Sequence, residues 1–155
     1  PSFQKRMHQN LSRIGGYSYT PEEKAFAEEI SKTLNRKLNT EFIEGVVPYE
    51  TPEKPGGSTD VGDVSFAVPT AGMRAATWVP GTPAHSWQAV AAGGTSIGEK
   101  GMMVAAKTLA LTAMQLMDDA AFRAQIKKEF IETRGAEFNY IPLLGDREPA
   151  LDYRN

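Results

Sequence analysis

The sequence predicts an α/β fold in which helices pack on a small mixed sheet. Three observations lead to this prediction: apolar residues recur at helical spacing in several segments, β-prone runs separate these segments, and one helix is apolar on nearly every side. A soluble helix of that last kind must be covered on more than one side. The chain has 155 residues, 41% of them hydrophobic, so it can bury one core as a single domain.

Composition and charge exclude several classes of protein. The formal net charge is −2, and acids and bases are mixed along the chain. The sequence therefore has no cluster of basic residues of the kind that binds nucleic acid or a membrane surface. The chain contains no cysteine, which excludes disulfides and cysteine-based zinc sites. Its first residues are basic but no apolar run follows, so they do not form a signal peptide. The first residue is not Met, as a processed chain or a piece of a longer one would explain.

The first helix is predicted over residues 3–14. Four apolar residues recur there at helical intervals, and Gly15-Gly16 then end the pattern. His8 lies beside the apolar stripe. We interpret it as a solvated or lightly packed histidine rather than a metal ligand.

A second helix begins at a strong start signal. Thr20 can cap the free amide groups, Pro21 suits the first helical position, and Glu23 completes a capping box. The amphipathic pattern that follows predicts a helix ending near Leu38-Asn39.

The middle of the chain contains the β-prone runs. Residues 42–47 form a short one, which we interpret as part of a surface connector. Residues 64–68 alternate like a strand, but Asp60 and Asp63 also fit a short capped helix, and both interpretations stay open. Residues 73–79 are the best candidate for a central strand.

Two more helices are predicted after residue 95. Ser96 and Glu99 fit a capping box that opens a helix running to about Met117. Its body, 102–117, is apolar on nearly every side, and the few strands available cannot cover it, which indicates missing partner surface. A helix over 120–133 follows, capped by the preceding aspartates, and the tail beyond it is predicted to be coil.

The residues with chemical potential leave alternatives open. Histidine is the commonest metal ligand, and His85 lies on a loop after the predicted strand, but the residues by themselves favour a histidine hydrogen-bonded to loop carbonyls. Asp60 and Asp63 fit either a carboxylate pair for acid–base work or turn-forming caps. The chain has neither a nucleophile elbow nor a phosphate loop.

Three motifs in order carry a family resemblance: GGSTDVGDVS at 56–65, GTPAHSWQ at 81–88 and GTSIGEKGMMVAAKTLALTA at 94–113. They resemble the C-terminal part of the catalytic domain of M20-type zinc amidohydrolases, most closely the branch that includes p-aminobenzoyl-glutamate hydrolase. YTPEEKAFAEEISKTL at 19–34 resembles the helix after their inserted dimerisation domain. The resemblance implies a partial three-layer zinc-peptidase-like domain. Residues 1–155 would be its C-terminal segment, and 1–18 the exit from the dimerisation domain.

The resemblance also implies roles for individual residues. His85 matches the family's last metal ligand, while Ser58, Thr59 and Asp60 match a loop with a supporting or substrate-side role. Asp63 matches the motif without an assigned role, and no catalytic residue falls within the segment. The family's His-x-Asp motif, bridging acid and Glu-Glu pair have no counterpart here. A catalytic zinc site needs about three protein ligands, so one histidine cannot hold it.

The function implied by the resemblance belongs to a full-length protein in the cytoplasm. Two zinc or manganese ions would polarise an amide carbonyl and activate a water molecule, which a glutamate deprotonates. The substrate would be an N-acyl amino acid, a small peptide or an aryl-amide of glutamate, and the protein a homodimer. The segment by itself, without the rest of the catalytic domain, is expected to be inactive and metal-free. The alternative is a non-enzymatic assembly module that uses the apolar helix Met102–Met117.

Overall fold

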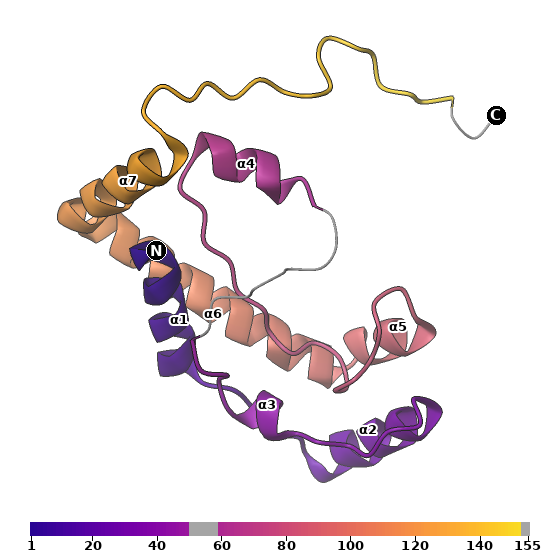
Figure 1. Cartoon of the computed structure of the whole chain (residues 1–155). Coiled ribbons are helices and arrows are strands. Elements are labelled where there is room, and N and C mark those ends of the chain that lie inside the picture. Colours follow the sequence, from indigo (N-terminus) through magenta and orange to yellow (C-terminus); the bar gives the residue numbers. More distant parts are fainter. Residues whose placement is uncertain (50–58, 153–155) are drawn as a thin grey trace.

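The computed structural model describes residues 1–49 and 59–152, which form seven α-helices joined by turns and extended segments (Figure 1). The helices are α1 (Ser2–Ile14), α2 (Pro21–Thr33), α3 (Glu41–Glu44), α4 (Val61–Ala67), α5 (Trp87–Gly93), α6 (Ser96–Asp118) and α7 (Ala120–Arg134). Within these ranges all regular structure is helical. The predicted α/β fold, with helices on a small mixed sheet in a partial three-layer zinc-peptidase-like arrangement, is therefore wrong.

The central-strand prediction fails at 73–79 because a strand requires a neighbouring strand to complete its hydrogen-bond ladder. The segment is extended but pairs with no other strand in the described chain. It lies across α6 instead: a Cβ built on Gly101 would be only 2.0 Å from the carbonyl oxygen of Ala76. The Tyr17 hydroxyl donates a 2.7 Å hydrogen bond to the same oxygen. The β-prone pattern of this segment therefore arises from packing against a helix and not from pairing with strands in a sheet.

The long helix α6 is the main packing partner of three other helices (Figure 1). The helices α1, α5 and α7 pack against it. A buried polar contact fixes α1, since the Asn10 amide donates to Thr112 Oγ1 and to Gln115 Oε1, each at 2.9 Å. Buried amides require such partners, so this pair of bonds also selects the register of the two helices.

A compact apolar cluster joins α2 to the start of α6. Ala27 and Ile30 from α2 meet Val79, Ala92 and Ile97, and all five are buried. Gly98 permits the close approach of α5 and α6, because a Cβ there would lie 2.2 Å from the carbonyl oxygen of Gly93. The cluster therefore anchors both ends of the 80–96 segment.

The ends of the helices confirm some predictions and correct others. The capping box at Thr20 and Glu23 is present, and Asp119 caps α7 as predicted. The cap of α6 is Thr95 and not Ser96, since the Thr95 hydroxyl accepts from the amide of Ile97. Of the two interpretations of 64–68, the helical one is confirmed by α4.

One helix prediction in the first third of the chain was wrong in extent, and one β-prone run is partly helical. The second helix ends at Thr33, five residues early, because Asn35 adopts a left-handed conformation (φ 51°). The amide groups of Asn35 and Arg36 then bond back to the carbonyls of Lys32 and Ser31, a Schellman ending. The β-prone run at 42–47 begins in the single helical turn α3.

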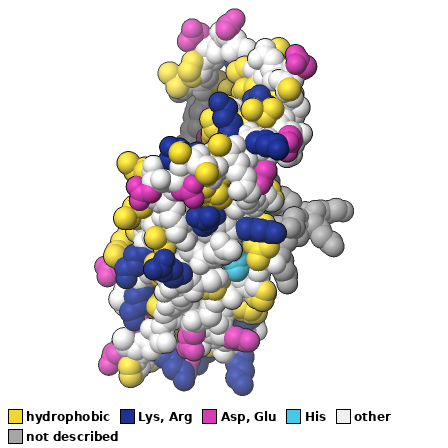
Figure 2. All heavy atoms as spheres, turned by 90° about the vertical axis from the view of Figure 1, so that its left-hand side faces the viewer, with side chains coloured by type: hydrophobic (Ala, Val, Ile, Leu, Met, Phe, Trp, Pro, Cys, Tyr) yellow, Lys and Arg dark blue, Asp and Glu magenta, His cyan; other side chains and the backbone are white. Residues whose placement is uncertain are grey.

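The outer face of α6 stays largely apolar in the described structure. Five large side chains on it are 47–78% exposed: Met102, Met103, Leu109, Met114 and Met117. Figure 2 shows one face of the molecule, on which apolar, basic and acidic side chains are intermixed. No helix among the described residues has the length and apolar character needed to cross a membrane.

Candidate functional site

His85 lies on a short loop that is fixed at both ends. Val79, buried at 1% exposure, anchors the entry, and the amide of Thr82 donates to its carbonyl at 3.1 Å. At the exit, the Ser86 hydroxyl donates to the carbonyl of Pro83 at 2.8 Å and caps α5 by accepting from the amide of Ala89 at 3.2 Å. The loop therefore holds the backbone of His85 in place while its side chain is exposed.

The backbone of His85 is left-handed, with φ at 59°. Outside glycine this conformation costs on the order of 1 kcal/mol, and it persists only where the surroundings enforce it. Here the flanking turn and the α5 cap enforce it. Such strained positions cluster at functional sites.

The described residues do not assemble a metal centre around His85. They contain no group of three or more histidine, aspartate or glutamate side chains placed to hold one ion. An imidazole by itself falls short of the roughly three protein ligands that a zinc site requires. Any metal bound through His85 therefore needs donors beyond the described residues.

The second set of predicted site residues precedes α4. Ser58 lies outside the described residues. The Thr59 hydroxyl accepts from the amide of Val61 at 3.3 Å and contacts Asp60 Oδ1 at 3.4 Å. Asp60 is exposed and occupies the N-cap position of α4, but its carboxylate caps no backbone amide. The side chain of Asp60 is therefore open to solvent.

The helix α4 is held by the end of α7 and the chain that follows it. The Tyr140 hydroxyl bonds to Asp63, and the Phe66 ring stacks on Phe138 and Tyr140 at 5.5 and 5.9 Å between centroids. The Arg134 guanidinium donates to the carbonyl of Phe66 at 3.2 Å. These contacts give Asp63, the motif residue without an assigned role, a structural partner.

The described part of the chain does not bring Thr59 and Asp60 together with His85. The helix α4 lies beside the C-terminal end of α7, whereas His85 precedes α5, which packs against the first turns of α6 (Figure 1). Within the described chain, no hydrogen bond or ion pair joins Thr59 or Asp60 to His85.

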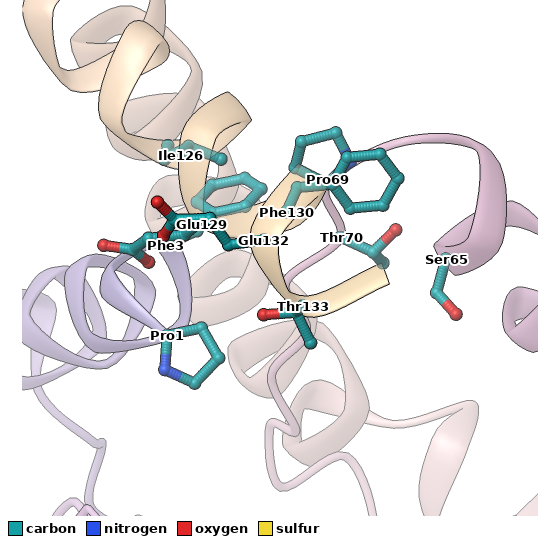
Figure 3. A pocket seen from close by; sticks show the side chains of 10 residues that line it. All are labelled: Pro1, Phe3, Ser65, Pro69, Thr70, Ile126, Glu129, Phe130, Glu132 and Thr133. Carbon is teal, nitrogen blue, oxygen red and sulfur yellow. The ribbon is translucent and has the colours of Figure 1, made fainter. Parts of the chain in front are cut away.

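A cavity of about 470 Å³ lies between the start of α1, the end of α4 and α7 (Figure 3). Phe3, Ile126 and Phe130 supply much of its apolar wall. Glu129, also in the wall, accepts a 2.8 Å hydrogen bond from the amide of Ser2. Of the predicted site residues that the structure describes, Thr59, Asp60 and His85 are all outside its lining, so the cavity is separate from the His85 loop.

Sequence reasoning missed a buried charged network. Beyond its capping bond from the Thr20 amide at 2.7 Å, the Glu23 carboxylate accepts from Ser96 Oγ and from Lys100 Nζ, both at 2.6 Å. Burial by itself would raise the pKa of Glu23, but the bonds from Lys100, Ser96 and Thr20 outweigh it and hold the pKa below its ordinary value. The spacing of Ser96 and Lys100, one helical turn apart, could have indicated their shared partner.

Tyr17 extends this network toward the extended segment. Burial, and then the nearby charge of Glu23, raise the pKa of the Tyr17 phenol to about 12. The hydroxyl therefore stays protonated and donates to Ala76, with the carbonyl of Ile97 a further 3.1 Å acceptor. The network fixes α2, the 73–79 segment and the start of α6 relative to one another.

Comparisons with known proteins connect the chain to one curated relative. It is 31% identical over 167 aligned residues to the p-aminobenzoyl-glutamate hydrolase subunit designated B of Escherichia coli (strain K12). The alignment covers 92% of this chain but only 35% of the relative, so the chain spans about a third of that protein's length. No family model and no solved structure matches the chain. The identity extends over nearly the whole chain, and we conclude that this protein is related to that p-aminobenzoyl-glutamate hydrolase subunit.

Proposed function

We propose that this chain is the C-terminal segment of an M20-type, metal-dependent amidohydrolase. Its substrate would be an N-acyl amino acid, a small peptide or an aryl-amide of glutamate. The observation that carries the proposal is the 31% identity, over 92% of the chain, to a protein whose name describes hydrolysis of p-aminobenzoyl-glutamate. Because the chain spans 35% of that relative, the activity is assigned to a longer protein that contains this sequence.

Within that protein, His85 is the residue that we assign to the metal. Its side chain is exposed, and its loop is tied to Val79 on one side and to the α5 cap on the other. A ligand held on a fixed loop loses little conformational freedom when it binds. These features support a ligand role, and the zinc or manganese ions of the proposal would supply Lewis-acid chemistry when bound.

The described residues by themselves do not fit a zinc site, since they offer no group of three donors. The proposal therefore places the other ligands and the general base in the remainder of the longer protein. Ser58, Thr59 and Asp60 are proposed to face the substrate through hydrogen bonds. The open carboxylate of Asp60 and the hydroxyl of Thr59 are groups that could make such bonds.

The test compares His85→Ala with His8→Ala in the longest reading frame that contains this sequence. Hydrolysis of p-aminobenzoyl-glutamate and bound zinc per chain are both measured. Loss of a metal ligand should lower the rate by at least about a hundredfold and reduce the zinc content, since even indirect partners of a metal ligand change activity ten- to a hundredfold. The other histidine of the chain, His8, is the matched control and should leave both quantities near their starting values. If the zinc content and the hydrolysis rate of His85→Ala were unchanged, His85 would not be a metal ligand.

The exposed face of α6 favours a second candidate, a non-enzymatic assembly module. Methionines dominate the large apolar side chains exposed there, and such flexible side chains adapt to varied partner surfaces. Sedimentation and binding of an apolar dye discriminate between the candidates. A monodisperse monomer with no dye-accessible apolar surface would contradict the assembly module.

A further inference from the structure

We propose that α2 and the loop after it form a binding pocket for a small oxyanion, such as a phosphate or dicarboxylate group. The pocket has a volume of about 460 Å³, within the usual range for small-molecule sites. Lys24 and Lys32 from α2 and Arg36 and Lys37 from the loop line it. The site is separate from the metal chemistry proposed above.

The Schellman ending of α2 brings these basic residues together. Lys24, Glu28 and Lys32 follow one another at four-residue spacing, so they share one face of the helix. The left-handed turn at Asn35 then reverses the chain, and residues 36–40 fold back beside that face. The same turn satisfies the carbonyls of Ser31 and Lys32 with backbone amides, which weakens the negative potential at the end of the helix.

The charges around the pocket are mostly unpaired cations. Within the described residues, Lys32 pairs with Glu29, but Lys24, Arg36 and Lys37 form no ion pair. Glu28 is the acid in the wall, and it opposes an anion. The cations outnumber it, so the pocket keeps a positive balance in a chain whose overall charge is −2.

A buried hydroxyl supplies the second, independent observation. Ser31 lines the pocket and is only 2% exposed, and its hydroxyl oxygen has no hydrogen-bond partner among the described residues. A buried hydroxyl without a partner is costly, and such groups commonly mark the place of a water or ion. A hydroxyl donor surrounded by ammonium and guanidinium groups is suited to a small oxyanion.

Binding of an oxyanion in this pocket would also affect the loop that carries His85. The Arg36 side chain lies against Gly81, where an added Cβ would be 3.0 Å from Arg36 Cδ. Gly81 itself has φ 84°, so the turn that starts the loop lies directly beside the pocket wall. An oxyanion that orders Arg36 would therefore stiffen the entry to that loop.

The experiment titrates the 155-residue chain with inorganic phosphate and, separately, with glutarate by calorimetry. Sodium chloride keeps the ionic strength constant, because exposed charges are screened by salt. We expect saturable binding of at least one of the two probes, and the tighter one identifies the chemical source of the oxyanion. Absence of saturable heat for both probes would overturn the proposal.

Matched variants test whether the binding occurs in this pocket. Ser31→Ala should weaken binding about tenfold, the effect of a hydrogen bond to a charged group, while leaving the thermal midpoint in chloride unchanged because its hydroxyl is unpaired. Lys37→Gln should weaken binding about threefold, as expected of an exposed charge. Lys107→Gln removes the same charge from an exposed position on α6 and should have no effect. Equal losses in Lys37→Gln and Lys107→Gln would show non-specific attraction and overturn the proposal.

Discussion

The carboxylate of Glu23 and the ammonium group of Lys100 lie 2.6 Å apart and connect α2 to α6 across 77 residues of sequence. The Glu23 side chain is 8% exposed and that of Lys100 is 34% exposed. The carboxylate also completes a capping box, so a single buried group serves both the local helix start and the tertiary contact. The two roles explain why this acid is buried at all.

A double-mutant cycle should show that this pair is coupled. Glu23→Gln keeps the shape but removes the charge, and should lower the free energy of unfolding by about 1–3 kcal/mol. Lys100→Met removes the other partner. Because Lys100 is partly exposed, we expect a coupling energy of only about 1 kcal/mol between them, measured by urea denaturation.

The exposed pair Lys32–Glu29 is the control for that cycle. Its side chains are 69% and 70% exposed, so the same type of cycle should give at most about 0.5 kcal/mol. Coupling energies of equal size in the two cycles would show that burial of Glu23 adds nothing to its interaction.

The same carboxylate should make stability depend on pH in the acid range. Because the pKa of Glu23 is lowered in the folded protein, its contribution is complete above the unfolded glutamate pKa of about 4.3. It is lost as the pH falls through the lowered folded value. As the pH falls below about 5, the free energy of unfolding should therefore decrease more steeply in the unsubstituted protein than in Glu23→Gln. Parallel curves for the two proteins would contradict the lowered pKa.

Sequence reasoning predicted the parts of the fold that local rules determine. The capping box at Thr20 and Glu23, the Asp119 cap and the ends at Gly15 and Gly135 depend on residues close in sequence, and each is present. The helix α5 was missed because seven residues give too short a periodic pattern. The strand at 73–79 was wrong because β-propensity measures packing against neighbours, and here the neighbour is a helix.

The candidate site was predictable only in part, for a similar reason. His85 is exposed and lies on a loop because nearby prolines and glycines in the sequence interrupt regular structure there. Its separation from Thr59 and Asp60 depends on how α4 packs against Phe138 and Tyr140, which no local pattern indicates. The metal-ligand role of His85 stays a prediction.

Gly101 should be intolerant of any side chain. A Cβ there would lie 2.0 Å from the carbonyl oxygen of Ala76 and 2.9 Å from Thr77 Cγ2, so Gly101→Ala must push the extended segment away from α6. We expect a loss of about 2–3 kcal/mol in the free energy of unfolding, despite the better helix propensity of alanine. The measurement is urea denaturation followed by circular dichroism.

Gly62 in α4 is the matched control, since a Cβ at that position meets no atom of the described residues within 4 Å. Gly62→Ala should gain up to about 1 kcal/mol from helix propensity. A stabilising Gly101→Ala would show that the 73–79 segment is not held against α6 as described.

The left-handed residue Asn35 should determine where α2 ends. It is exposed, so its side chain contributes little packing, and its φ of 51° is the feature under test. Asn35→Gly should keep or slightly raise the free energy of unfolding, because glycine adopts this conformation without strain. Asn35→Val should lower it by about 1–2 kcal/mol, because a β-branched residue is strained there. Differential scanning calorimetry of both variants measures the difference. Equal stability of the glycine and valine variants would mean that the chain does not reverse at Asn35. The loop that carries Arg36 and Lys37 would then not lie beside α2.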